Sequence, residues 1–165
     1  MGTVNLTGTG TGTGHMSMSD VKVPYTIEVN VTGAAAVLEK GSALAEADIL
    51  QILDLPADSL LLGAGINVTT ADTQGSPDIT MDLGIGGAVD IFVDGGAPTS
   101  TGYLAAGSNG ATGFENGILV SSADTLDIVL GQASSFSSAD DWVIRVYVVL
   151  MDISARPAGG AAVDA

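Results

Sequence analysis

The chain has 165 residues, of which 46% are hydrophobic and only 14% are charged. Four basic residues stand against 19 acidic ones, and the net charge is −15. Nucleic acids and anionic membranes are bound by clustered Lys and Arg, so this balance argues against both as partners. The sequence has no cysteine, which excludes disulfides, zinc–thiolate sites and cysteine nucleophiles. A chain of this size buries one core, so we expect a single domain. The sequence carries no cofactor-binding motif, and we expect no cofactor.

Residues 1–22 are predicted to form an extended arm, because the run Gly8–Gly14 alternates Gly with Thr and has no face that could pack. Such an arm could add as a strand to a neighbouring sheet. A loose terminus, or a cloning remnant around Gly14–Met16, fits the same residues. If the arm docks, its contact residues are predicted to be Val4, Leu6, Thr9, Thr11, Thr13, Met16 and Met18.

From Tyr25 onward, apolar and polar residues alternate, which predicts strands with one face on a core. Turn sequences such as Gly86-Gly87 and Asp94-Gly95-Gly96 separate these segments. The inward residues are predicted to be Ile27, Val29 and Val31; Ile79, Met81 and Leu83; Val89, Ile91 and Val93; Leu126, Ile128 and Leu130; and Trp142, Ile144, Val146, Val148 and Leu150.

Short strands without helical connectors predict an all-β fold, an antiparallel β-sandwich that is jelly-roll-like and spans residues 23–154. The Pro and Gly of residues 155–165 predict a flexible C-terminal tail. The best helical candidate is Ser42–Leu53, although its second half equally fits a strand. That half resembles Asp124–Val129, and the similarity could mark corresponding strands of two sheets.

The last predicted strand is apolar on both faces, because Val143, Tyr147, Val149 and Met151 occupy its outer side. Either an extra layer of this chain covers that side, or it meets another subunit. In the second case Tyr147, Val149 and Met151 are interface residues.

Catalytic motifs are missing from the sequence, and we expect no enzyme. The single histidine, His15, lies in the predicted arm, so no Ser–His–Asp triad can form in the core. The sequence also lacks a nucleophile elbow, a Walker loop and a dinucleotide-binding fingerprint.

Acidic pairs are the one kind of chemistry that the composition permits. Asp90 and Asp94 would share one face of a strand, where they could bind Ca²⁺ or simply face solvent. We favour the solvated face and predict no metal site. Two further pairs are of the same kind: Asp78 with Asp82, and Asp140 with Asp141.

Several segments together resemble small virion structural proteins of tailed bacteriophages. They are Ala47–Thr70, Asp82–Ile85, Asp90–Gly95, Ala123–Ile128 and Val143–Val149. The resemblance lies in general pattern rather than in a specific motif. It implies a β-sandwich decoration or cement protein, commonly a trimer, that binds the major capsid protein and bridges capsomers without catalysis. It also implies synthesis in the host cytoplasm and a place on the outer capsid surface.

Two other functions stay open at this stage. A tail fibre, knob or spike module would bind host glycans through aromatic platforms, for which Tyr103, Phe114 and Phe136 are the loop candidates. A hydrolase on a β scaffold would need an acid, a base or a nucleophile that no pattern indicates.

Overall fold

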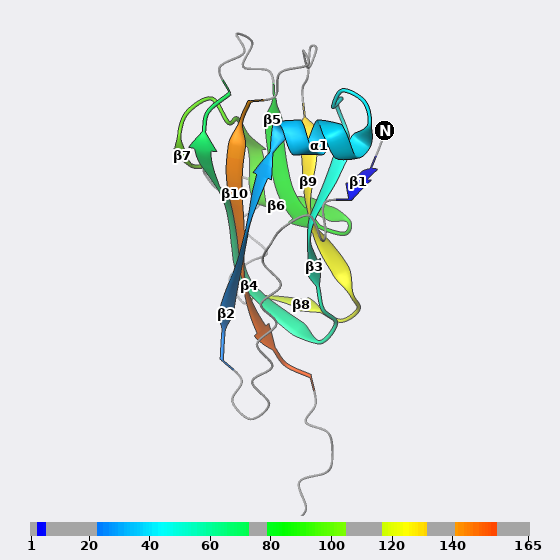
Figure 1. The fold of residues 1–165 in the computed structure, drawn as a ribbon. Helices are drawn as coiled ribbons and strands as arrows, with labels where there is room; N and C mark the ends of the chain where they lie inside the picture. The colour runs from blue at the N-terminus through cyan, green and yellow to red at the C-terminus, as the bar shows by residue number, and fades with distance from the viewer. Residues whose placement is uncertain (1–2, 6–22, 73–78, 105–116, 132–140, 155–165) are drawn as a thin grey trace, which may run out of the picture.

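The protein is a sandwich of two β-sheets with one short helix (Figure 1), as the computed structural model describes it for residues 3–5, 23–72, 79–104, 117–131 and 141–154. The predicted all-β sandwich is confirmed. Its elements are β1 (Thr3–Asn5), β2 (Tyr25–Thr32), α1 (Gly33–Lys40), β3 (Ile49–Leu55), β4 (Ser59–Thr70), β5 (Thr80–Ile85), β6 (Ala88–Gly96), β7 (Gly102–Tyr103), β8 (Ile118–Val120), β9 (Asp124–Gly131) and β10 (Val143–Asp152).

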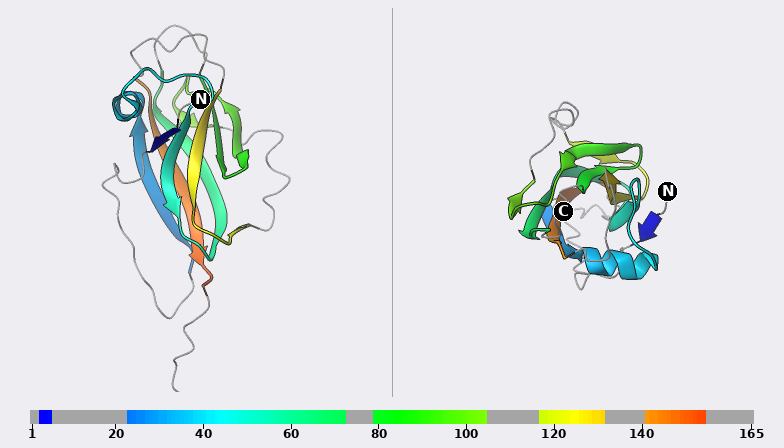
Figure 2. Two further views of the ribbon diagram at one scale, coloured as in Figure 1. Left: turned by 90° about the vertical axis from the view of Figure 1, so that its right-hand side faces the viewer. Right: turned by 90° about the horizontal axis from the view of Figure 1, so that it is seen from above.

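Sheet A has the strand order β1-β3-β9-β5-β6, and sheet B has the order β2-β10-β4-β7, with β8 also paired to β4. Neighbouring strands run antiparallel, except that β1 runs parallel to β3. Most connections pass from one sheet to the other, as in a jelly roll, and the two sheets enclose a common interior (Figure 2).

The core lies between the sheets, where the predicted alternation holds along most strands. All five predicted inward residues of β10, including Trp142 just before it, are fully buried. Met81 and Leu83 on β5 and Leu126 on β9 are also fully buried. Each such side chain contributes about 1.5–3 kcal/mol on burial, so these residues supply much of the stability.

The prediction for β6 is partly wrong. Val89 is 36% exposed, whereas the adjacent residues Phe92 and Val93 are both buried. The pairing of β5 with β6 shifts register twice, and such a bulge turns two consecutive side chains to the same side. The two strands approach so closely that a Cβ on Gly84 would collide with the backbone of β6.

Ser42–Leu53, the best helical candidate, is not a helix: its second half belongs to β3, the strand alternative that the sequence left open, and the helix lies earlier, at α1. Alternating burial of Leu50 and Ile52 makes that segment a strand. The α1 helix has no long apolar stripe and is defined by its ends. The Thr32 side chain accepts a hydrogen bond from the Ala35 N–H at 3.0 Å, and Gly41 ends the helix at φ +73°.

The two similar segments around Ile52 and Ile128 do not lie in different sheets. β3 and β9 are antiparallel neighbours in sheet A, with Leu50 paired to Ile128. Both strands cover the same core from the same side, which explains why they carry the same alternation.

Only Thr3–Asn5 of the predicted arm belongs to the described residues, as β1 on the edge of sheet A. The remainder of the arm, residues 1–2 and 6–22, and the predicted tail, residues 155–165, lie outside them. Within the described ranges, no helix has both the length and the apolar character needed to cross a lipid bilayer.

Candidate interaction surface

The outer face of sheet B presents the side chains that alternate with the core residues of β10. Ile144, Val146 and Val148 are fully buried, so Arg145 and Tyr147 between them point outward. The neighbouring strands add polar and aromatic groups beside these two. We call this set the sheet B patch, and its members are Glu28, Asn30, Asn67, Tyr103, Arg145 and Tyr147.

Strand register brings the patch together. Arg145 is opposite Asn30 of β2 on one side and Asn67 of β4 on the other, and Asn67 is opposite Tyr103 of β7. One row of side chains therefore crosses all four strands. The next row joins Glu28, Tyr147 and Gly65.

Two tyrosines form the aromatic part of the patch. The ring centroids of Tyr103 and Tyr147 are 6.2 Å apart and the ring planes are inclined by 85°, an edge-to-face pair. Tyr147 lies across Gly65, where the lack of a side chain makes room for the ring. Tyr103 is 74% exposed. We call the pair of Tyr103 and Tyr147 the aromatic corner, and its Tyr103 ring is open to solvent.

Among the described residues, the contacts that Arg145 makes with Glu28 and Asn30 are long and therefore weak. Its Nη1 lies 3.9 Å from Glu28 Oε2, and its Nε donates to Asn30 Oδ1 at 3.5 Å. The side chains of Arg145 and Glu28 are 46% and 55% exposed, so solvent screens their attraction. A guanidinium has five N–H groups, and these contacts leave others able to bind a partner.

The structure places the predicted interface residues on two different parts of the sandwich. Tyr147, Val149 and Met151 are half-buried on the outer side of β10. Val4 is on β1, at the edge of sheet A, opposite Leu50. The other predicted arm contacts lie outside the described residues: Leu6, Thr9, Thr11, Thr13, Met16 and Met18.

The sequence did not assign Glu28, Asn67 or Arg145 to an interface, and it considered Tyr103 only as a glycan-binding loop residue. The alternation along β2 does indicate that Glu28 points outward. The sequence pattern places Tyr103 in a loop, but it lies in the two-residue strand β7. The pairing of Tyr103 with Asn67 places Tyr103 beside Tyr147. A contact between residues so far apart in sequence cannot be predicted from a local sequence pattern.

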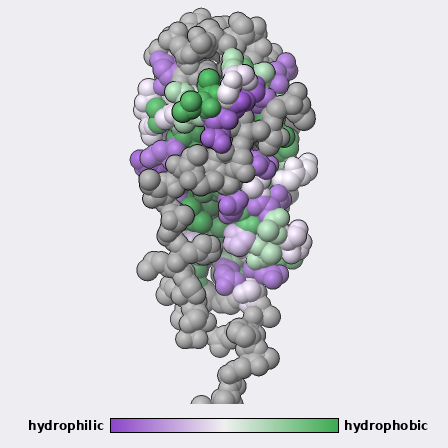
Figure 3. All heavy atoms as spheres, turned by 45° about the vertical axis from the view of Figure 1, so that its right-hand side comes forward, coloured by the Kyte–Doolittle hydropathy of each residue, from purple (hydrophilic) through white to green (hydrophobic). Residues whose placement is uncertain are grey.

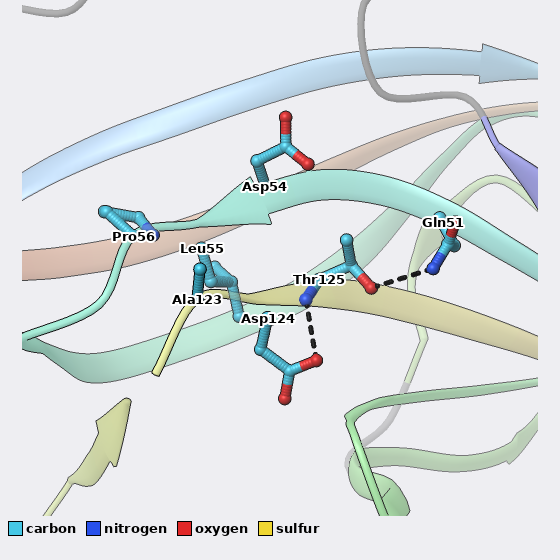
Figure 4. A pocket seen from close by; sticks show the side chains of 7 residues that line it. All are labelled: Gln51, Asp54, Leu55, Pro56, Ala123, Asp124 and Thr125. Atoms are coloured by element: carbon cyan, nitrogen blue, oxygen red, sulfur yellow. Dashed lines mark hydrogen bonds between the residues drawn. The ribbon is translucent and has the colours of Figure 1, made fainter. Parts of the chain in front are cut away.

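A depression of about 460 Å³ lies at the start of β9 (Figure 4). The Gln51 amide donates to Thr125 Oγ1 at 3.3 Å, and the Thr125 N–H donates to Asp124 Oδ1 at 2.8 Å. The carboxylates of Asp54 and Asp124 point away from each other, so this depression does not bring an acid and a base together (Figure 4). It is lined by Gln51, Asp54, Leu55, Pro56, Ala123, Asp124 and Thr125.

Asp127 lies on the outer side of sheet A, where Oδ1 is buried without a hydrogen-bond partner among the described residues. Burial raises the pKa of its carboxyl, the Thr125 side chain lowers it, and the charge of Asp124 raises it again. The net direction is upward, so folding favours the protonated form of Asp127.

Of the acidic pairs considered from sequence, only Asp90 with Asp94 lies wholly within the described residues. Asp90 is exposed near the start of β6 and Asp94 is half-buried near its end, while Asp82 Oδ1 accepts the Gly95 N–H at 2.6 Å. Among the described residues, no group of three or more His, Cys, Asp or Glu side chains could hold a metal ion. His15, Asp78 and Asp140 lie outside these residues, as do Phe114 and Phe136.

No protein-family model matches the sequence. No curated protein matches it either. Three solved structures match the fold of this chain. A chain of the capsid of Ralstonia phage GP4 is 16% identical with a TM-score of 0.49, covering 92% of this chain and 99% of that one.

A chain of the cyanophage Pam1 capsid is 18% identical with a TM-score of 0.45, covering 78% of this chain and 83% of that one. A chain of the capsid of Helicobacter pylori bacteriophage KHP30 is 10% identical with a TM-score of 0.46, and the match covers 81% of this chain and 92% of that one. Similarity at this level concerns the fold and assigns no function.

Proposed function

We propose that the protein is a phage virion structural protein, a capsid decoration or cement protein that binds the major capsid protein on the outer head surface and bridges capsomers. The observation that carries the proposal is the outward side of β10. Tyr147, Val149 and Met151 stay half-buried there, on a strand whose other side already fills the core. A strand that is apolar on both sides suits a protein that works by contact with other protein.

The surface composition supports a role in assembly. Among the coloured residues of the face seen in Figure 3, hydrophobic and hydrophilic residues are interspersed. The net charge of −15 would oppose contact with packaged DNA. It is compatible with the outside of a shell, where repulsion from the genome is not a cost.

The edge of sheet A supports the predicted role of the arm. β1 adds to this edge as a three-residue parallel strand, with Thr3 opposite Ile49 and Asn5 opposite Gln51. An edge that accepts a strand from its own arm has the geometry to accept one from a neighbour. We therefore extend the proposal to an arm that joins the protein to adjacent molecules on the shell.

Binding to purified shells tests this function. The full chain and a variant without residues 1–20 are incubated with undecorated capsids, and particles are separated by sedimentation. We expect the full chain to cosediment and the truncated chain to bind more weakly while keeping the buried-tryptophan fluorescence of Trp142. Failure of the full chain to cosediment would exclude decoration, and equal binding of both would exclude the arm.

A glycan-binding fibre or spike module is the second candidate, and the Tyr103–Tyr147 corner is the observation that favours it. Sugars stack on exposed aromatic rings, and Tyr103 is 74% exposed. A glycan array decides between the two. Binding that is lost on Tyr103→Ala but kept on Tyr103→Phe would favour the glycan function.

The number of copies in the assembly is part of the same proposal. The phage resemblance implies a homotrimer at each site on the shell, and the number of copies that cosediment with each shell measures it.

A further inference from the structure

We propose that the sheet B patch binds a second copy of this chain across a two-fold axis, with Arg145 of each copy facing Glu28 of the other. This contact uses the outer side of sheet B, the side on which the proposed shell contact also rests, so one copy could not make both contacts through this face at once. It is measured on the isolated chain, without shells. It would give the isolated chain a dimer rather than the trimer that the phage resemblance implies.

The chemistry of the patch is complementary to itself. It contains one guanidinium and one carboxylate, Arg145 and Glu28, which are 3.9 Å apart. It also contains two amides, Asn30 and Asn67, each able to donate and accept hydrogen bonds. A two-fold interface places the same patch on both partners, so every group must find its complement within that patch. The sheet B patch meets this condition.

The charge distribution favours this face for self-association. Two chains of net charge −15 repel each other over most orientations. Among the described residues, Arg145 is the only exposed basic side chain, because the Lys40 side chain is largely buried against Asp48, with 17% of its surface exposed. The exposed acids elsewhere in the described part are Glu39, Glu46, Asp54, Asp58, Asp90, Asp141 and Asp152.

The pairing of Arg145 with Glu28 is stronger between copies than within one. Inside a single chain both side chains are exposed, and their contact is worth little. Across a two-fold axis, two arginines and two glutamates alternate in one cluster and each charge has two opposite neighbours. Burial beneath Tyr103 and Tyr147 of the partner excludes water and strengthens the attraction.

The size of the face predicts a weak dimer. Four strands at about 4.8 Å spacing and the ten-residue β10 at about 3.3 Å per residue define the face. With side chains at its margins it offers roughly 600 Å² per partner, at the low end of specific interfaces. We therefore expect dissociation in the micromolar range and a marked weakening by salt.

Charge reversal tests the contact in the full chain. Sedimentation equilibrium at low salt is carried out on the wild type, on Arg145→Glu and on Glu28→Arg. We expect each variant to associate at least about tenfold more weakly, because like charges then meet across the axis. Leu38→Ala, at an 82% exposed position on α1, is the control and should associate like the wild type.

An equimolar mixture of the two variants separates contacts between copies from contacts within one. Each variant keeps two like charges in its own patch. In a dimer that contains one copy of each, however, the two acidic groups of Arg145→Glu face the two basic groups of Glu28→Arg, and both reciprocal contacts join opposite charges. The mixture should recover dimers of wild-type strength. A three-membered ring would retain one like-charge contact and recover only in part.

Several results would overturn the two-fold contact. These are a wild type that stays monomeric at about 100-fold above micromolar concentration, single variants that associate normally, or a mixture no better than its components. Shell binding measured by cosedimentation is independent of all three, so failure here leaves the decoration proposal to its own test.

Discussion

Gly65 lies directly beneath the ring of Tyr147, so closely that a Cβ at position 65 would come within 2.5 Å of the tyrosine hydroxyl oxygen. The two residues are paired across β4 and β10 in the middle of sheet B. Because position 65 is a glycine, the Tyr147 ring can lie against the sheet. In this position the ring makes its edge-to-face contact with Tyr103. The aromatic corner therefore depends on the absence of a side chain on the neighbouring strand.

Gly65→Ala should displace the Tyr147 ring and lower the free energy of unfolding by about 0.5–1.5 kcal/mol, the cost of moving one side chain out of its preferred rotamer. Urea unfolding followed by the fluorescence of Trp142 measures the change. The cost should largely disappear in the background Tyr147→Ala, since no ring is then displaced. Gly87→Ala is the matched control, because a Cβ there meets no atom within 4 Å. An equal cost in both backgrounds would contradict this account of Gly65.

Asp48→Ala should destabilise the protein by about 3 kcal/mol, because it removes the partner of a largely buried lysine. Asp48 is 1% exposed and accepts hydrogen bonds from Lys40 Nζ and from the Ala45 N–H. This carboxylate ties the end of α1 to the start of β3. Thermal and urea unfolding measure the effect.

Glu39→Ala is the control for that experiment, since Glu39 is exposed on the same helix. It should change the free energy of unfolding by less than about 0.5 kcal/mol. If both substitutions cost the same, the buried ion pair is not what stabilises this end of the sandwich.

Asp127→Asn should stabilise the protein at neutral pH, by up to about 1 kcal/mol because solvent screens a half-buried group. Burial raises the pKa of Asp127 above its ordinary value of 3.8. The folded state therefore holds the proton more tightly than the unfolded state, and stability falls as pH rises through the raised pKa. Urea unfolding at several pH values above about 4 measures this.

In Asp127→Asn, the fall in stability that accompanies the titration of Asp127 should be absent, while the pH dependence contributed by other carboxylates persists. Asp54→Asn is the matched control, since Asp54 is exposed and on the neighbouring strand. If the free energy of unfolding changes with pH in the same way for the wild type and Asp127→Asn, burial does not raise the pKa of this carboxyl.

Leu126→Ala should cost about 2–5 kcal/mol, because Leu126 is fully buried in the sandwich and its removal leaves a cavity. Leu119→Ala should cost less than about 1 kcal/mol, since that leucine is 58% exposed on β8. Chemical unfolding of the two variants compares the same substitution inside and outside the core. Similar costs would mean that the two sheets do not pack as described.

The alternation along β10 was sufficient to predict which of its residues fill the core, because a strand with period two can bury only one set. The same rule failed on β6, where a bulge turns both Phe92 and Val93 inward. For β3 the rule left a helix and a strand open, because the apolar residues of that segment fit both. Bulges and pairing partners are not local properties, so the sequence pattern could not reveal them.

By itself, the sequence determined that this protein has one β-rich core, a strongly acidic charge and a final strand apolar on both sides. Periodicity and composition report these properties residue by residue. Only the tertiary structure decided that Tyr103 meets Tyr147 over Gly65 and that Arg145 lies between Asn30 and Asn67. Those contacts join strands distant in sequence, and strand register, set by the packing of the whole sandwich, brings them together.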